Sequence, residues 1–186
     1  MVENHLERAF ELGYANAAVS FTKICNRPVR CNHIGTGFHS LAGQAFLKEV
    51  FAQNETSALL TTDIFGDFEG KSYLLLSRNE FDVVTRTIPE KGNSLIDLKE
   101  EFIKEMDNIL SASVISRLAD NLNQRVYGDV PVLVGWVAGK IGDIIYDDFE
   151  SQTEEVYISV ATFEFEGIET LKPLFIWVID SSRLDK

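Results

Sequence analysis

Two β-hairpins are predicted from two similar stretches of the chain. The first covers residues 58–76 and reads ALLTTDIFGDFEGKSYLLL, two apolar runs around a turn that contains Gly66 and Gly70. The second covers residues 156–179, where Phe163-Glu-Phe165-Glu-Gly167 lies between apolar runs. Apolar arms on either side of a glycine-containing turn are typical of hairpins. The tripeptide Phe-Glu-Gly occurs in both stretches, 97 residues apart, which predicts a tandem duplication of one unit.

The elements around the hairpins repeat in the same order. A long helical pattern precedes each hairpin, followed by a strand at residues 29–34 or 131–136 and a second helix at residues 39–51 or 140–149. Residues 79–87 read as a connecting helix, and residues 89–93 as the hinge between repeats of about 1–88 and 93–186. The predicted core faces of the two long helices are Leu6, Ala9, Phe10, Gly13, Ala17, Phe21 and Ile24 in the first half, and Leu95, Leu98, Phe102, Ile103, Met106, Ile109 and Leu110 in the second.

Hairpins combined with long helices predict an α+β fold. We expect two layers, with the long helices packed on a mostly antiparallel sheet, and a pseudo-twofold axis that relates the two repeats. A length of 186 residues suits one compact domain made of both repeats, and 45% hydrophobic residues exclude a disordered chain. No apolar run reaches the roughly 18 residues of a membrane span, and the N-terminal residues do not resemble a signal peptide. We therefore expect a cytoplasmic protein.

Charge and cysteine content narrow the class of partner. The net charge of −12 would repel nucleic acid and anionic lipid, so neither is an expected partner. Cys25 and Cys31 are the only cysteines, which favours two reduced thiols over a disulfide framework. The histidines His5, His33 and His39 have no tight spacing with the cysteines, so no metal is predicted.

The second long helix carries the candidate site. On a helical wheel, Glu101, Glu105 and Asn108 fall together on the solvent side, and Glu105 and Asn108 are neighbours because they are three residues apart. An ordinary polar helix face explains such a cluster equally well. Pro131 follows Asn108 by twenty-three positions.

This pattern resembles the signature of the CheC, CheX and FliY phosphatases of chemotaxis. In that signature, an Asp or Ser is followed after three residues by Glu, after two more by Asn, and about twenty-two residues later by Pro. Glu105, Asn108 and Pro131 match it, whereas Glu101 departs from the usual leading residue. The duplicated layout is closest to CheC. The resemblance implies a CheC-like fold, with Glu105 and Asn108 catalytic and Glu101 and Pro131 supporting.

The same register applied to the first helix gives a degenerate site. Arg8 and Glu11 occupy the positions of the family's Glu and Asn, 97 residues before Glu105 and Asn108. Neither side chain reproduces a carboxylate beside an amide, so the first site is expected to be inactive. Tyr14 and Asn16 lie nearby but outside this register.

The resemblance also implies a substrate, which is the aspartyl phosphate of a CheY-type response-regulator receiver domain. An acyl phosphate is already activated, so an amide that orients a water is sufficient, and Asn108 is the candidate for that role. Glu105 would pair with the receiver's active-site lysine. The chain needs no cofactor of its own, because Mg²⁺ is expected in the receiver. CheD is a further candidate partner. The alternative is a non-catalytic module, similar to the middle domain of FliM, that binds a receiver, CheD or a flagellar switch component.

Overall fold

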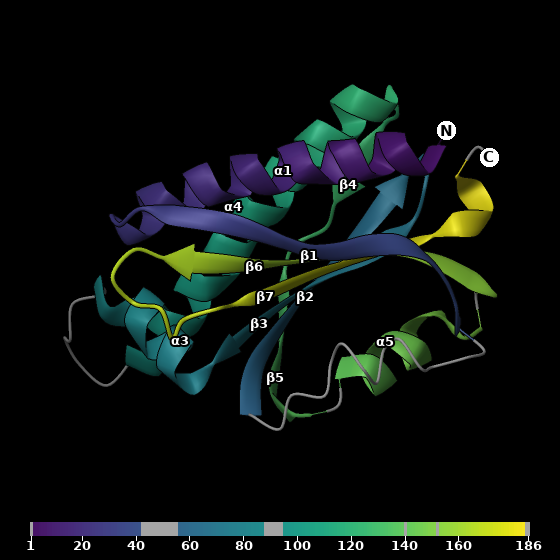
Figure 1. The fold of residues 1–186 in the computed structure, drawn as a ribbon. Coiled ribbons are helices and arrows are strands. Elements are labelled where there is room, and N and C mark those ends of the chain that lie inside the picture. The colour runs from purple at the N-terminus through teal and green to yellow at the C-terminus, as the bar shows by residue number, and fades with distance from the viewer. Residues whose placement is uncertain (1, 42–55, 88–94, 140, 152, 185–186) are drawn as a thin grey trace.

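The computed structural model describes residues 2–41, 56–87, 95–139, 141–151 and 153–184. They form helices and a seven-stranded sheet (Figure 1). In chain order the elements are α1 (Val2–Cys25), β1 (Val29–Ser40), β2 (Thr56–Gly66), β3 (Gly70–Ser77), α3 (Arg78–Val84), the 3-10 turn Thr85–Thr87, α4 (Leu95–Leu122), β4 (Val126–Gly128), β5 (Val132–Ala138), α5 (Ile141–Phe149), β6 (Glu155–Phe165), β7 (Leu174–Asp180) and the 3-10 turn Ser181–Arg183.

The sheet is antiparallel throughout the described strands, and the two predicted hairpins are confirmed. β2 pairs with β3, and β6 pairs with β7. The strand order is β1-β6-β7-β3-β2-β4, with β5 also paired to β2. The pair β7–β3 therefore lies in the middle, each hairpin extends outward from it, and a strand from the other half completes each edge. This order is the one that a duplicated unit would produce.

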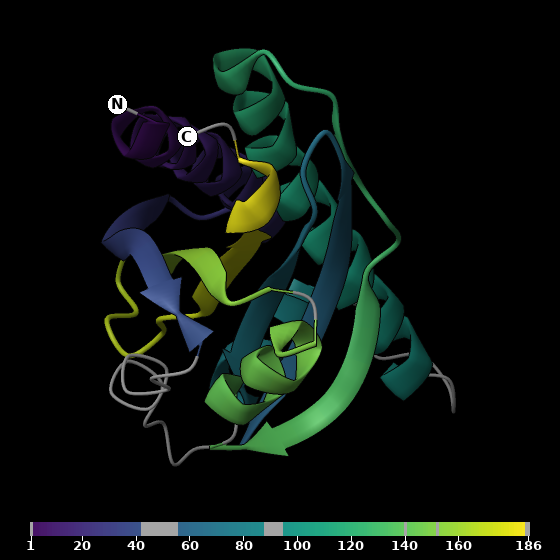
Figure 2. The same ribbon diagram turned by 90° about the vertical axis from the view of Figure 1, so that its right-hand side faces the viewer.

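Helices cover both faces of the sheet (Figures 1 and 2). α1 and α4 lie side by side on one face and enclose the larger core, which includes Phe10, Phe21, Leu110 and Trp177. α5 covers part of the opposite face through Ile141, Ile145 and Phe149. The predicted α+β fold with long helices on an antiparallel sheet is confirmed, and α5 adds a smaller cover on the second face.

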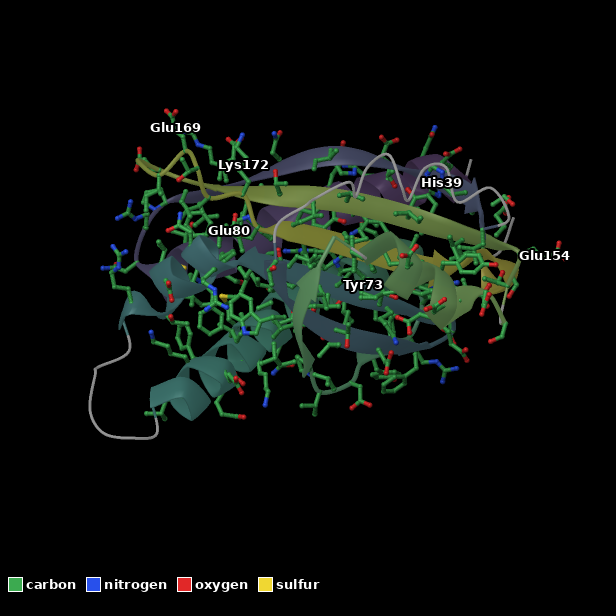
Figure 3. The ribbon with its side chains drawn as sticks, turned by 90° about the horizontal axis from the view of Figure 1, so that it is seen from below. His39, Tyr73, Glu80, Glu154, Glu169 and Lys172 are labelled. Carbon is green, nitrogen blue, oxygen red and sulfur yellow. The ribbon has the colours of Figure 1, made fainter. Side chains whose placement is uncertain are left out.

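Polar contacts hold α5 on its face of the sheet. Tyr73 of β3 donates a hydrogen bond to Asp148 of α5 at 2.7 Å. Lys71 lies 3.2 Å from the same carboxylate and 3.3 Å from Asp63 of β2. Figure 3 views the molecule from this side, with Tyr73 labelled.

The two long helices end in the same way. Asn26 and Asn123, 97 positions apart in the sequence, both have a positive φ, of 47° and 53°. The next residue in each case donates its backbone N–H five residues back, from Arg27 to Thr22 at 3.2 Å and from Gln124 to Ala119 at 3.1 Å. This is a Schellman cap, and asparagine tolerates the left-handed conformation that it requires. A duplication predicts such matched caps. The boundaries of the two repeats, at about residues 88 and 93, stay a prediction.

Some element predictions need correction. His39 and Ser40 were assigned to the start of a helix, but they lie in β1, where they pair with Val156 and Glu155. Residues 42–51 of that predicted helix and the hinge at 89–93 lie outside the described residues. Leu98 and Ile109 were predicted in the core but are 49% and 36% exposed. The predicted helices at 79–87 and 140–149 correspond to α3 with its 3-10 turn and to α5.

Candidate functional site

The candidate site lies on the outer face of α4. Glu105 and Asn108 are both exposed, while Ile103, Met106 and Leu110 of the same helix are buried. Because residues three apart on a helix are neighbours, the carboxylate and the amide lie on the same side of α4. The predicted site pair is therefore presented to solvent by a helix whose opposite face is fixed in the core.

Glu105 and Asn108 differ from Glu101, which is paired along the same helix. Glu101 accepts a hydrogen bond from Lys104 at 2.8 Å, so it is engaged along its own helix. Among the hydrogen bonds and ion pairs of the described residues, none involves the side chain of Glu105 or Asn108. A carboxylate and an amide in this state are available to bind an external group.

Apolar side chains adjoin the pair on α4. Leu98 and Ile109 are the two side chains displaced from the predicted core, and both lie on the exposed part of the helix. Phe102, which lies between these two residues in the sequence, is half-buried. Polar groups within a partly apolar surface are typical of protein-binding sites.

At the corresponding positions of the first half, the two side chains pair with each other. Arg8 donates to Glu11 at 2.9 Å, and the two side chains are exposed on α1. Each therefore neutralises the other. Tyr14 is buried and donates to Ser159 of β6 at 2.9 Å, and Asn16 donates to the backbone carbonyl of Ser113 at 3.3 Å. Both of these side chains have structural contacts, in agreement with their exclusion from the site.

Asp107 is a residue that the sequence did not single out. It precedes Asn108 but points the other way, and it is fully buried. Its carboxylate accepts a hydrogen bond from Thr62 of β2 at 2.9 Å and a longer one from Ser111, at 3.5 Å. Ser111 in turn lies 3.2 Å from Ser72 of β3. Burial raises the pKa of Asp107 from 3.8 to about 7, and the two hydroxyls lower it only in part.

Pro131 is buried in the link between β4 and β5. Its ring fixes φ and removes a backbone donor, which suits the residue immediately before an edge strand. From this position Pro131 can support the fold. Unlike Glu101, Glu105 and Asn108, it does not lie on α4.

No group of three or more His, Cys, Asp or Glu side chains among the described residues is arranged to hold a metal ion. Within the same residues, no helix has the length and apolar character needed to cross a membrane.

Comparisons with known proteins were made by sequence and by structure. No family model and no curated protein matches the sequence. FliY from Thermotoga maritima superposes with a TM-score of 0.71 at 14% identity, over 98% of this chain and 91% of FliY. The chain has the CheC/FliY fold. The predicted resemblance to CheC, CheX and FliY is thereby confirmed at the level of the fold.

Two complexes share this fold. A chain of the FliG–FliM complex from H. pylori superposes with a TM-score of 0.64 at 9% identity, over 99% of this chain and 98% of that one. A chain of the CheX–CheY–BeF3–Mg complex from Borrelia burgdorferi gives 0.55 at 12% identity, over 92% and 97%. The fold thus occurs both in a protein that binds CheY and in a flagellar protein complex.

Proposed function

We propose that this chain is a phosphatase that hydrolyses the aspartyl phosphate of a CheY-type receiver domain. The observation that carries the proposal is the exposed, unpaired Glu105 and Asn108 on α4 of a CheC/FliY fold. Their spacing on one exposed helix face matches the Glu-x-x-Asn part of the family signature. The complex of CheX with CheY, beryllium fluoride and magnesium supports a receiver domain as the partner.

Asn108 orients the attacking water in this mechanism. The amide can both accept from and donate to a water without bringing charge near the phosphate. The water attacks phosphorus, the bond from phosphorus to the aspartyl oxygen breaks, and the products are the free carboxylate and inorganic phosphate. Holding one water in line is an orientation effect, which can supply large factors in rate.

Glu105 fixes the docked position. A carboxylate close to the phosphate would be repelled, so its role is to pair with a lysine of the receiver's active site. Leu98 and Ile109 supply apolar contact area on the same helix. The Mg²⁺ belongs to the receiver, and this chain supplies no cofactor.

The remaining parts of the proposal follow from the same family. The protein acts in the cytoplasm, in chemotaxis or a related two-component pathway, and CheD is a further candidate partner. The two repeats, about 1–88 and 93–186, form one domain in which only the second keeps an active site. The ion pair between Arg8 and Glu11 supports the loss of the first site.

The experiment follows the decay of phosphorylated receiver domains with and without the protein. The native protein should accelerate the decay. Asn108→Ala should lower the accelerated rate about 100-fold, because a misplaced reactant can slow a reaction by a factor of that size. Asn121→Ala is the matched control, since Asn121 is also an exposed amide of α4 and donates only to the carbonyl of Arg117. Full activity of Asn108→Ala would refute the water-positioning role.

Glu105→Ala separates docking from chemistry. It should raise the concentration needed for half-maximal rate and reduce the dependence of binding on salt, because it removes one charge pair from the interface. Asp120→Ala is the control, as an exposed carboxylate of the same helix, about three turns beyond Asn108, that pairs with Arg117 at 3.9 Å.

A non-catalytic module similar to the FliM middle domain is the second candidate. It is favoured by the TM-score of 0.64 to a chain of the FliG–FliM complex, above the 0.55 to the CheX complex. Such a module would bind a receiver, CheD or a flagellar component without changing the lifetime of the acyl phosphate. If the native protein binds receivers but accelerates none, this second function replaces the first.

A further inference from the structure

One row of residues crosses the sheet beneath both long helices. Thr62 of β2 pairs with Ser72 of β3, and Ser72 pairs with Trp177 of β7. Trp177 in turn pairs with Ser159 of β6, and all four side chains are buried. α4 contacts Thr62 and Ser72, whereas α1 contacts Trp177 and Ser159. Each long helix thus rests on two residues of the same row.

The part of the row under α1 is packed mainly by aromatic rings. The ring centroids of Phe10 and Trp177 lie 5.9 Å apart, with the two planes at 64°. Tyr14 adds one hydrogen bond, which its hydroxyl donates to Ser159 at 2.9 Å. Aromatic rings with a single hydroxyl are therefore sufficient to hold a long helix on this row of the sheet.

The part of the row under α4 is polar. At the position 97 residues after Phe10, α4 carries Asp107, whose carboxylate accepts a hydrogen bond from Thr62 at 2.9 Å. Ser111 donates to the same carboxylate at 3.5 Å and lies 3.2 Å from Ser72. Burial of a carboxyl group costs free energy, which hydrogen bonds offset. Because aromatic packing holds the equivalent position of α1, packing alone does not account for an acid at this position.

The buried carboxylate restricts the direction of the exposed amide beside it. Asp107 and Asn108 are consecutive in α4, so their side chains leave the helix about 100° apart. The hydrogen bond from Thr62 ties Asp107 to the sheet, and rotation of α4 about its axis would distort that bond. At the outer radius of a helix, about 5–6 Å, a rotation of about 10° moves an atom by about 1 Å. A displacement of about 1 Å can slow the reaction of a positioned group about 100-fold.

We propose that Asp107 is a positioning residue, which sets the rotation of α4 and thereby holds Asn108 in the direction that orients the attacking water. This inference rests on the proposed phosphatase function and adds to it a buried residue that touches neither the receiver nor the water. Glu105 is less sensitive to the same rotation, because its long side chain can adjust its own torsion angles in an ion pair. Loss of Asp107 should therefore lower kcat and leave KM nearly unchanged.

Initial rates of dephosphorylation at increasing concentrations of phosphorylated receiver separate kcat from KM. Asp107→Ala should lower kcat about 10-fold, with KM within about twofold of native. Asp107→Asn keeps the shape and an acceptor for Thr62, so it should retain kcat within about twofold. Phe10→Leu is the matched control, because Phe10 is fully buried at the corresponding position of α1, and it should leave both constants within about twofold of native.

Thr62→Val tests the same hydrogen bond from the sheet, and it serves also if Asp107→Ala fails to fold. It removes the donor to Asp107 and leaves α4 unchanged. It should lower kcat, and its combination with Asp107→Ala should lower kcat no further, because both variants break one contact. Effects that multiply in the double variant would overturn the proposal, as would native kcat in Asp107→Ala. Equal losses in Asp107→Ala and Phe10→Leu would also overturn it, since destabilisation would then explain both.

The rotation of α4 can be measured without activity. Residual dipolar couplings of backbone N–H groups, measured by NMR, vary periodically along a helix, and their phase reports its rotation about its axis. Over residues 103–112, Asp107→Ala should shift this phase by about 10°, whereas Asp107→Asn and Phe10→Leu should not. An unchanged phase in Asp107→Ala would overturn the proposal. If the native protein accelerates the decay of no receiver, the proposed phosphatase function fails, and the phase still decides whether Asp107 sets the rotation of α4.

Discussion

Asp107 makes the stability of the protein depend on pH, and Asp107→Asn should remove that dependence. The carboxylate is fully buried beneath α4, with Thr62 and Ser111 as its hydrogen-bond partners. No charged group contributes to the shift of its pKa, which burial dominates. The charged side chains of β2 and β3, Asp63 and Lys71, pair with each other and with α5 on the opposite face. An asparagine has the same shape and keeps the contacts with both hydroxyls, but it cannot ionise.

The size of the effect follows from the difference in proton binding. The pKa of Asp107 is about 7 in the folded protein and near 3.8 when the chain is unfolded. Between these values the folded state holds a proton that the unfolded state has lost, so stability falls as the pH rises toward 7 and is constant above it. One bound proton corresponds to about 1.4 kcal/mol per pH unit. The advantage of Asp107→Asn over the native protein should therefore grow by about 3 kcal/mol between pH 5 and pH 8.

Chemical unfolding at the two pH values measures this difference. Urea titrations of both proteins, followed by the fluorescence of the buried Trp177, give the free energy of unfolding at pH 5 and pH 8. Other carboxylates titrate equally in both proteins and cancel in the comparison. Asp120→Asn, an exposed carboxylate of the same helix, should show no such growth. If the difference between Asp107→Asn and the native protein changes by less than about 0.5 kcal/mol, the carboxylate is not buried in the way described.

Three other changes test separate parts of the structure. Arg8→Ala and Glu11→Ala should leave receiver dephosphorylation within about twofold of native, since an exposed ion pair contributes little and the first site is expected to be inactive. A large loss of rate in folded protein would reverse the assignment of the two halves. Gly13→Val should lower the free energy of unfolding by about 1–3 kcal/mol, because a Cβ at that position already comes within 3.0 Å of Val114 where the long helices cross. Cys31 should react slowly with a thiol reagent at pH 8, because burial raises its pKa to about 12; labelling at the rate of a free thiol in unfolded protein would contradict this.

The sequence predicted the framework of the fold because local and global signals agree there. In each half a glycine-containing turn joins two apolar arms, and burial of the sheet between helices leaves one register for them. The long helix of the first half has its small and apolar residues on one arc, and Leu6, Phe10 and Phe21 are all fully buried. Where the core is made of apolar side chains, the periodicity identifies it correctly.

The apolar periodicity predicts the wrong buried face for α4, because part of the face that is buried is polar. On the helical wheel, the apolar residues alone predict a core face centred between the directions of Leu98 and Leu110. The side chains that are buried also include Asp107 and Ser111. At 100° per residue the true buried face is rotated by roughly 80° from the predicted one. Leu98 and Ile109 are displaced to the surface as a result. Only the sheet could reveal this, since the hydroxyls of Thr62 and Ser72 that receive the polar side chains belong to distant parts of the sequence.

The same rotation distinguishes α4 from the corresponding long helix of the first half. At the positions 97 residues earlier, α1 carries Phe10 and Tyr14 in place of Asp107 and Ser111. Phe10 packs on Tyr157 and Trp177 with ring centroids 5.9 Å away in both cases, contacts that depend weakly on direction. Hydrogen bonds to a carboxylate are directional, so Asp107 restricts the rotation of α4 about its axis, as the hydrogen bond from Tyr14 to Ser159 does for α1.

Orientation is also what the proposed chemistry demands. A side chain that positions a water has to be held by rigid elements, whereas an ion pair such as Arg8–Glu11 tolerates rotation of its helix. The cost is a buried ionisable group, and the fold limits it by surrounding Asp107 with hydroxyls from two strands and its own helix. The polar core of α4 and the free Glu105 and Asn108 above it thus form one arrangement, in which the buried side of the helix sets the direction of the exposed side.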